Sequence, residues 1–158
     1  MSQPFDPYAP PRAQEVGGPY AAAIGGVRPR LFSPGQIGAA ALLGSALAGA
    51  LLFGINEQRL GRSGGLAKAL AAGVVITGFI MFVGTLLPER FPSFIFGLAQ
   101  FLALRFYAQS VQGDAYRHHL DSGGLRGSNW GVVGAIAAAV VCLMVVIFVL
   151  VFGLGLEF

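Results

Sequence analysis

The chain has 158 residues, of which 55% are hydrophobic and 11% charged, with 24 glycines and a formal net charge of +3. Soluble domains have about a quarter of their residues charged, so this composition excludes an ordinary soluble domain and favours an integral membrane protein. The basic residues lie in expected tails and loops without interleaved exposed aromatics, which argues against nucleic acid as a partner.

Residues 1–30 are rich in proline, glycine and alanine. Such a segment cannot bury enough apolar surface to offset the entropy lost on ordering, so we predict a disordered tail. Phe5, Tyr8 and Tyr20 leave open a short motif that binds a protein partner, although a solvated tail is the simpler interpretation. We recognise no cleavable signal peptide and expect the first apolar segment to act as an uncleaved signal anchor.

Residues 31–158 are predicted to form one all-α transmembrane domain, an integral membrane four-helix bundle. The first predicted helix covers residues 34–55, which contain no charged residue. At about 1.5 Å per residue it can cross roughly 30 Å of hydrocarbon. Ser33 suits the N-cap, Pro34 the first helical position and Gln36 the third, which together predict a capping box.

Small residues recur along the first two predicted helices. Ala40, Gly44 and Ala48 are four residues apart, which predicts a face that another helix can approach closely. The second predicted helix, 66–87, carries Gly73 and Thr77 at the same spacing. Because a short, glycine-containing turn joins the two helices, we expect them to be antiparallel neighbours.

The third predicted helix, 93–113, is ambiguous because Gln100 and Arg105 interrupt its apolar sequence. A full crossing requires the helix to continue past Tyr107, with Arg105 extending to the interface. The alternative is a re-entrant or interfacial segment. We prefer the crossing, and expect the helix to project about two turns into water and end at the Gly123–Gly124 pair.

The fourth predicted helix, 131–154, is the most hydrophobic segment and begins just after Trp130, a residue typical of the membrane interface. With four crossings, the first and third loops lie on one side of the membrane. These loops carry more arginine and lysine than the opposite side, which favours both termini outside the cytoplasm by a small margin.

No residues form a recognisable catalytic, cofactor-binding or metal-binding motif, so we predict no enzyme activity, no cofactor and no metal site. Asp114 and His118 have i, i+4 spacing, but no further ligand joins them. The strongly polar residues at membrane depth are Gln36, Gln100 and Arg105. A polar or ionisable residue at that depth is by default a functional hypothesis, although snorkelling also explains Arg105.

The segments SPGQI (33–37), LLGSALAG (42–49) and LLPER (86–90) give the chain a family resemblance. It resembles a set of small bacterial polytopic membrane proteins with an SPGQI-type opening to the first helix. This resemblance implies a bacterial inner (cytoplasmic) membrane and about four crossings. It carries over no activity and no site residues.

The sequence therefore predicts a non-enzymatic, multi-pass protein of a bacterial inner membrane. We expect it to be a scaffold or accessory subunit that contacts lipid, and contacts protein partners or copies of itself through its small-residue helix faces. The alternative is a small homo-oligomeric channel or carrier, in which Gln36, Gln100 and Arg105 line a path.

Overall fold

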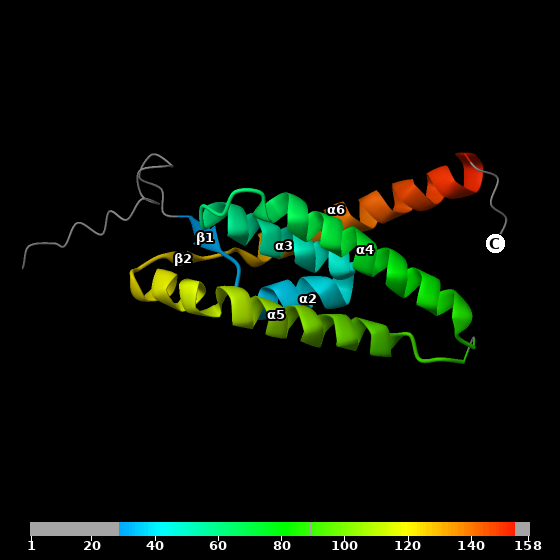
Figure 1. Ribbon diagram of the computed structural model, residues 1–158, viewed down its shortest axis with the longest axis horizontal. Helices are drawn as coiled ribbons and strands as arrows, with labels where there is room; N and C mark the ends of the chain where they lie inside the picture. The colour runs from blue at the N-terminus through cyan, green and yellow to red at the C-terminus, as the bar shows by residue number, and fades with distance from the viewer. Residues whose placement is uncertain (1–28, 89, 154–158) are drawn as a thin grey trace, which may run out of the picture.

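The computed structural model describes residues 29–88 and 90–153, so the predicted tail lies almost wholly outside the described residues. The described chain is mainly helical, as predicted (Figure 1). Its elements are β1 (Arg30–Leu31), α2 (Pro34–Gly44), α3 (Ala46–Arg59), α4 (Gly65–Leu86), α5 (Phe94–Asp121), β2 (Leu125–Arg126), α6 (Asn129–Phe148) and the π-helix η1 (Val149–Gly153).

The prediction of one crossing helix over residues 34–55 is wrong, because this segment forms two helices that fold back on each other. In a straight helix, residues 32 and 56 would be about 36 Å apart. Instead, the backbone N–H of Phe32 donates to Asn56 Oδ1 at 2.9 Å, and Asn56 Nδ2 donates to the Phe32 carbonyl at 2.8 Å. Helices α2 and α3 therefore form a helical hairpin, whose base holds Phe32 and Asn56 and whose tip is Ser45.

The hairpin turns at Ser45, which has φ 85° and ψ 166°. This backbone conformation is almost restricted to glycine and costs a serine of order 1–3 kcal/mol. It ends α2 after Gly44 and starts α3 at Ala46 within a single residue. Close packing of the two helices offsets this cost: a Cβ at Gly49 would lie 2.9 Å from the Ala41 Cβ and from the Ile37 carbonyl oxygen.

Helices α4, α5 and α6 are long and apolar enough to cross a membrane. By contrast, α2 and α3 have 11 and 14 residues, or about 16 and 21 Å, too short for roughly 30 Å of hydrocarbon. The described residues thus form a helical hairpin plus three helices long and apolar enough to span a membrane, and the predicted four-helix bundle is not confirmed. The third predicted crossing corresponds to α5, whose 28 residues are long and apolar enough to span, whereas the first predicted crossing is divided into two short helices.

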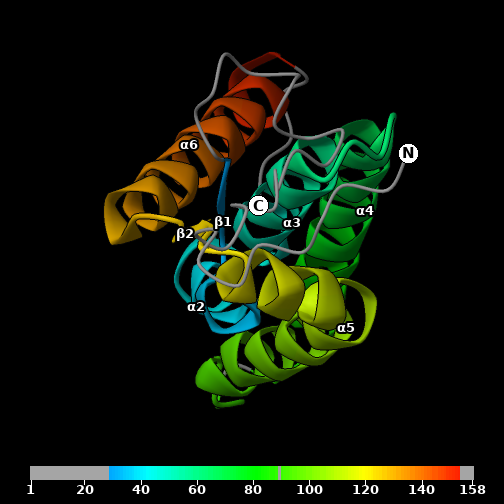
Figure 2. The same ribbon diagram turned by 90° about the vertical axis from the view of Figure 1, so that its left-hand side faces the viewer.

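The hairpin lies between the three long helices, with α6 on one side and α4 and α5 on the others (Figures 1 and 2). Its buried residues form the core, among them Ile37, Ala40, Ala48 and Leu52, each 0% exposed. The hairpin fills only the half of the bundle near its base. Beyond the tip, the second half of α6 leads away from α4 and α5 (Figure 1).

The second predicted helix matches α4 to within one residue at each end, and α3 and α4 are antiparallel neighbours. Gly73 allows their close approach: a Cβ there would lie 2.6 Å from the Ala50 Cβ. At its other end, α5 stops where expected, since Gly123 has φ 79° and the Gly124 amide donates to the His119 carbonyl at 2.8 Å.

The end of the bundle at the hairpin base, here called the base side, is closed by a short parallel β pair. Arg30 pairs with Leu125 and Leu31 with Arg126, so the chain before the hairpin is joined to the α5–α6 connection. The chain enters at the base side, and η1 ends at the far side (Figure 1). The described chain thus begins and ends at opposite ends of the bundle, whereas the sequence analysis expected both termini on one side of the membrane.

Candidate functional site

Gln36, predicted as an intramembrane polar residue, is a structural residue at the base. Its Oε1 accepts from the Ser33 amide at 3.0 Å, and Ser33 Oγ accepts from the Gln36 amide at 3.2 Å, which confirms the capping box. Its Nε2 donates to the Gly127 carbonyl at 3.0 Å and to Asn129 Oδ1 at 2.8 Å. Both polar ends of Gln36 are thus used to join α2 to the start of α6.

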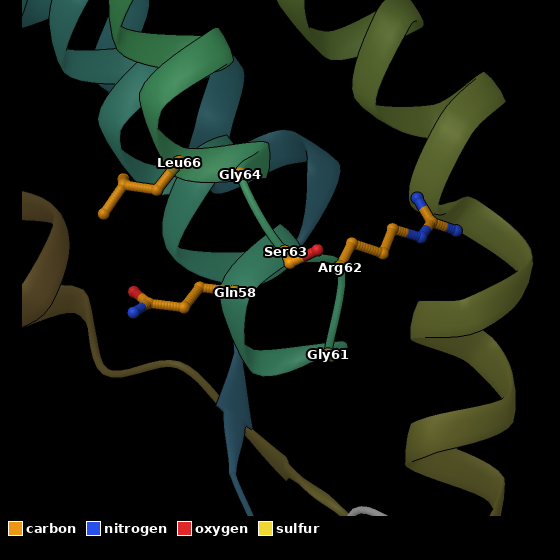
Figure 3. A pocket seen from close by; sticks show the side chains of 6 residues that line it. All are labelled: Gln58, Gly61, Arg62, Ser63, Gly64 and Leu66. Atoms are coloured by element: carbon orange, nitrogen blue, oxygen red, sulfur yellow. The ribbon is translucent and has the colours of Figure 1, made fainter.

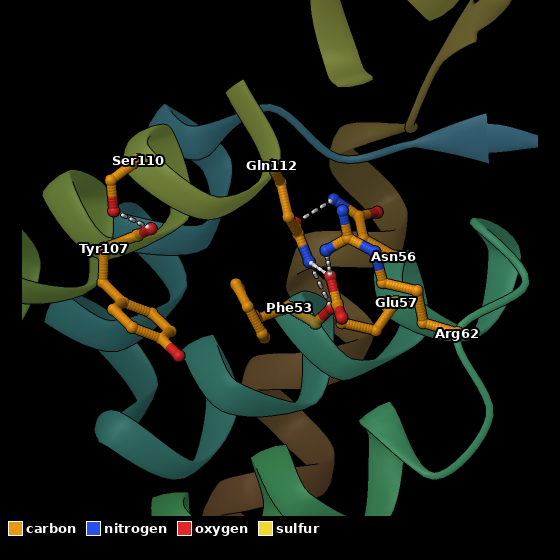
Figure 4. Close-up of polar contacts among 7 residues, drawn as sticks. All are labelled: Phe53, Asn56, Glu57, Arg62, Tyr107, Ser110 and Gln112. Atoms are coloured by element: carbon orange, nitrogen blue, oxygen red, sulfur yellow. Dashed lines mark hydrogen bonds and ion pairs between the residues drawn. The ribbon is translucent and has the colours of Figure 1, made fainter. Parts of the chain in front are cut away.

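A second polar cluster, the base clamp, fastens α3 to α5 (Figure 4). Gln112 of α5 is 1% exposed; its Oε1 accepts from Asn56 Nδ2 at 3.1 Å. Its Nε2 donates to the Phe53 carbonyl at 3.1 Å and to Glu57 Oε1 at 2.8 Å. Arg62 Nη1 also donates to Glu57 Oε1 at 2.8 Å. The sequence analysis missed this clamp, although the polar residues that follow the apolar segment were a visible signal.

Arg105 lies on the outside of the bundle and does not join the other predicted polar residues. Its side chain is exposed and its guanidinium lies over the Phe101 ring, 5.8 Å from the centroid. Its Cβ is 3.0 Å from where a Cβ at Gly38 would lie, so the stem packs on α2. The described residues therefore do not bring Arg105 together with Gln36 in one path.

The predicted packing row of Ala40, Gly44 and Ala48 is buried, but the fold-back places its members on both arms of the hairpin. A Cβ at Gly44 would lie 2.9 Å from the Ala48 Cβ and 3.0 Å from the Ile136 Cα of α6. Close approach by another helix is thus confirmed at Gly44. The approaching helices are α3 and α6, whereas the sequence analysis expected the second crossing.

Three oxygen atoms in the interior of the bundle are buried and have no hydrogen-bond partner among the described residues. They are Ser45 Oγ at the turn, Thr77 Oγ1 of α4 and Gln100 Oε1 of α5. An unpaired buried polar group costs about 1–3 kcal/mol and calls for an explanation such as a bound ion or water. The base clamp is satisfied by its own residues, whereas these three atoms are not.

Thr77 and Gln100 lie on helices that pack against different arms of the hairpin, α4 on α3 and α5 on α2. On α4, Gly73 faces Leu47 and the Ala46 carbonyl, and Thr77 is one helical turn further along the same face. On α5, Gly97 lies against Leu42 and Phe101 lies against Gly38, so Gln100 is beside α2 between the levels of these two residues. The three oxygen atoms therefore come from three different elements.

The backbone adds polar groups at the Ser45 turn. The last carbonyls of α2 and the Ala46 and Leu47 amides of α3 have no partners within their own helices, because helix ends leave such groups free, whereas the Ala48 amide donates to the Ser45 carbonyl at 3.0 Å. The negative end of one helix dipole and the positive end of the other thus meet at Ser45. The sequence analysis counted Thr77 as a packing residue and did not single out Ser45, although a Gly–Ser pair is a common site of sharp helix kinks.

A shallow pocket of about 230 Å³ lies at the α3–α4 turn, where Arg62 points away from Gln58 and Leu66 (Figure 3). It is formed mainly by the glycine-containing turn and has one charged side chain. Within the described residues, no group of three or more His, Cys, Asp or Glu side chains is arranged to hold a metal ion. The hairpin tip is therefore the candidate functional site.

The chain matches no protein-family model, no curated protein and no solved structure.

Proposed function

We propose that the chain is a subunit of a small channel or carrier in a bacterial inner (cytoplasmic) membrane. The observation that carries this proposal is the helix break at Ser45 inside the bundle, where the buried Ser45 Oγ has no hydrogen-bond partner among the described residues. Broken helices within a membrane are tolerated where they are buried in protein or line a water-filled cavity. In many carriers, such breaks form the binding site for the ion or substrate.

The proposed channel or carrier is a homo-oligomer. The interior near the hairpin is filled, since Ala40 and Ala48 are 0% exposed, which leaves no path along the axis of one chain. Beyond Thr77, α4 has no buried residue, and α6 has none beyond Ala139. These faces are free to contact further copies, and the path is expected between copies at the level of the tip.

The proposed orientation places the base side in the cytoplasm. Basic residues favour the cytoplasmic side of a membrane protein. The base side carries Arg30, Arg59, Arg62, Lys68, Arg117 and Arg126, whereas the described part of the far side carries Arg90. Ser93→Cys, between α4 and α5, should therefore react with an impermeant maleimide in intact cells, and Ser63→Cys only after lysis. The reverse pattern would contradict this orientation.

Flux through reconstituted protein tests the proposed function. Purified protein in liposomes should conduct or exchange Na⁺ or K⁺, measured with an ion-sensitive dye trapped inside. Thr77→Val removes the unpartnered hydroxyl with little change in volume and should change the flux severalfold. Thr85→Val is the matched control, because Thr85 lies on the same helix and its hydroxyl donates to the Phe82 carbonyl on an exposed face. Absence of flux above empty liposomes would refute the proposal.

The second candidate is a scaffold or accessory subunit of a membrane complex, also without enzymatic activity. The observation in its favour is the large unpaired apolar surface beyond the tip, where Phe79, Phe82 and Phe148 are each more than 60% exposed. Purification in a gentle detergent distinguishes the two candidates. A stoichiometric complex with other chains supports the accessory role, and a homogeneous homo-oligomer supports the channel or carrier.

A further inference from the structure

We propose that the base side of the bundle binds the headgroup of an anionic phospholipid through Arg30, Arg59 and Arg126, here called the arginine group. Arg59 Nη1 donates to the Arg30 carbonyl. The parallel pairing of Arg30 with Leu125 and of Leu31 with Arg126 puts Arg30 and Arg126 at neighbouring register positions. With about 4.8 Å between strands and about 3.3 Å per residue, their Cα atoms lie roughly 6 Å apart. Lipid binding here does not depend on transport, so it goes beyond the proposed function.

The arginine group has no counter-ion in the part of the chain that the structure describes. The ion pair found there joins Arg62 Nη1 to Glu57 Oε1 at 2.8 Å and so occupies the nearby buried carboxylate. Among the described residues, no carboxylate lies within 4 Å of the side-chain nitrogen atoms of Arg30, Arg59 or Arg126. Because like charges repel one another, an anionic partner at this place is electrostatically favoured.

The arginine group lies at the depth expected for lipid headgroups. Helix α6 is long and apolar enough to cross a membrane, and it starts at Asn129, three residues after Arg126. The headgroup region is roughly 5–8 Å thick on each side of the hydrocarbon, so residues just before such a helix lie within it. Trp130, at the start of α6, is 82% exposed and belongs to a residue type enriched at this interface. The β pair holds Arg30 at the same end of the bundle (Figure 1).

Arg59 is held in a position from which it can bind a phosphate group. Its guanidinium lies over the Phe32 ring, 5.4 Å from the centroid, and its Nη1 is bonded to the Arg30 carbonyl. A guanidinium has five N–H donors, and the other donors of Arg59 have no partner among the described residues. Guanidinium groups bind phosphate oxygens through paired hydrogen bonds. Arg30 and Arg126 are exposed and add positive charge, which favours an anionic lipid over a zwitterionic one.

The fluorescence of Trp130 tests this proposal, because Trp130 is the single tryptophan of the chain and lies four residues from Arg126. The full chain is reconstituted into phosphatidylcholine liposomes that contain phosphatidylglycerol as the minor lipid. One of the two lipids is brominated near its headgroup, since bromine quenches tryptophan fluorescence on contact. At equal fractions, brominated phosphatidylglycerol should quench Trp130 more strongly than brominated phosphatidylcholine. Arg126→Gln should lower the relative affinity for phosphatidylglycerol about fivefold, and Arg30→Gln combined with Arg126→Gln about 25-fold.

Arg90→Gln is the charge-matched control, because Arg90 is exposed between α4 and α5 at the far side, and it should leave the lipid preference at Trp130 unchanged. Arg30 and Arg126 are the residues to replace, since Arg59→Gln would also remove a contact within the fold. Equal quenching by the two brominated lipids, or a preference that survives in the double variant, overturns the inference. A loss in Arg90→Gln as large as in Arg126→Gln also overturns it, because net charge would then be responsible.

Discussion

The base of the hairpin depends on Asn56, and Asn56→Leu is the most direct perturbation of the fold-back. Asn56 is 2% exposed and makes three hydrogen bonds: it accepts from the Phe32 amide and donates to the Phe32 carbonyl and to Gln112 Oε1. Leucine fills a similar volume but pairs with none of these groups. The substitution therefore removes the polar closure of the hairpin while keeping the site filled.

Each of the three groups left unpaired costs about 1–3 kcal/mol when buried. Exposed polar residues such as Gln58 and Arg62 lie at the base, so we take the lower value for each group. We expect the free energy of unfolding to fall by about 3 kcal/mol, or Tm by roughly 6–12 °C for a domain of this size. Thermal unfolding in mild detergent, followed by circular dichroism, measures the change.

Gln58→Leu is the matched control, because Gln58 is exposed on the same helix, two residues from Asn56. A surface change of this kind should alter the free energy of unfolding by less than about 0.5 kcal/mol. If Asn56→Leu unfolds at the same temperature as Gln58→Leu, these hydrogen bonds do not hold the hairpin closed and the reasoning is refuted.

Three further predictions test the hairpin itself. In a cysteine-free background, Arg30→Cys and Ser63→Cys should react with an impermeant maleimide from the same side of the membrane. Labelling of the two cysteines from opposite sides would instead show that residues 34–55 cross the membrane once. Gly49→Ala should lower the free energy of unfolding by about 1–3 kcal/mol, because the added methyl group would lie 2.9 Å from the Ala41 Cβ of α2. Gly78→Ala is the control, because a methyl group there meets open space and should not lower the free energy of unfolding. In ion-free buffer, Ser45→Gly should raise the unfolding free energy by about 1 kcal/mol by relieving the positive φ, and a lower Tm would contradict strain there.

Local sequence signals predicted several elements well. The capping box of Ser33 and Gln36 starts α2 as expected, because it involves residues only three apart. Helix α4 follows from an apolar segment bounded by glycine and proline, and α5 ends at the glycine pair. Each of these features depends on residues that are close together in the sequence, so the sequence alone is enough to predict it.

The candidate site was only partly predictable. Gln100 was identified because a polar residue at membrane depth stands out in an apolar segment. Thr77 was identified for its size, and its role at the tip depends on the neighbours that α3 provides. Gln36 and Arg105, like Gln100, are strongly polar residues within apolar sequence, yet Gln36 is hydrogen-bonded at the base and Arg105 is exposed. These residues differ in side-chain burial and in hydrogen-bond partners, and both depend on parts of the chain that are distant in sequence.

Composition and apolar length by themselves determined that the chain is helical and has segments suited to a membrane, because hydropathy depends only on residue type. Only the tertiary structure decided that residues 34–59 return to the side where they enter. A single straight helix over residues 34–55 would have the same hydropathy and the same capping box at Ser33 and Gln36. The strained turn at Ser45 is stable because Gly49 packs on Ala41, and because Asn56 closes the base against Phe32. These contacts join residues far apart in sequence, and they set both the topology and the site.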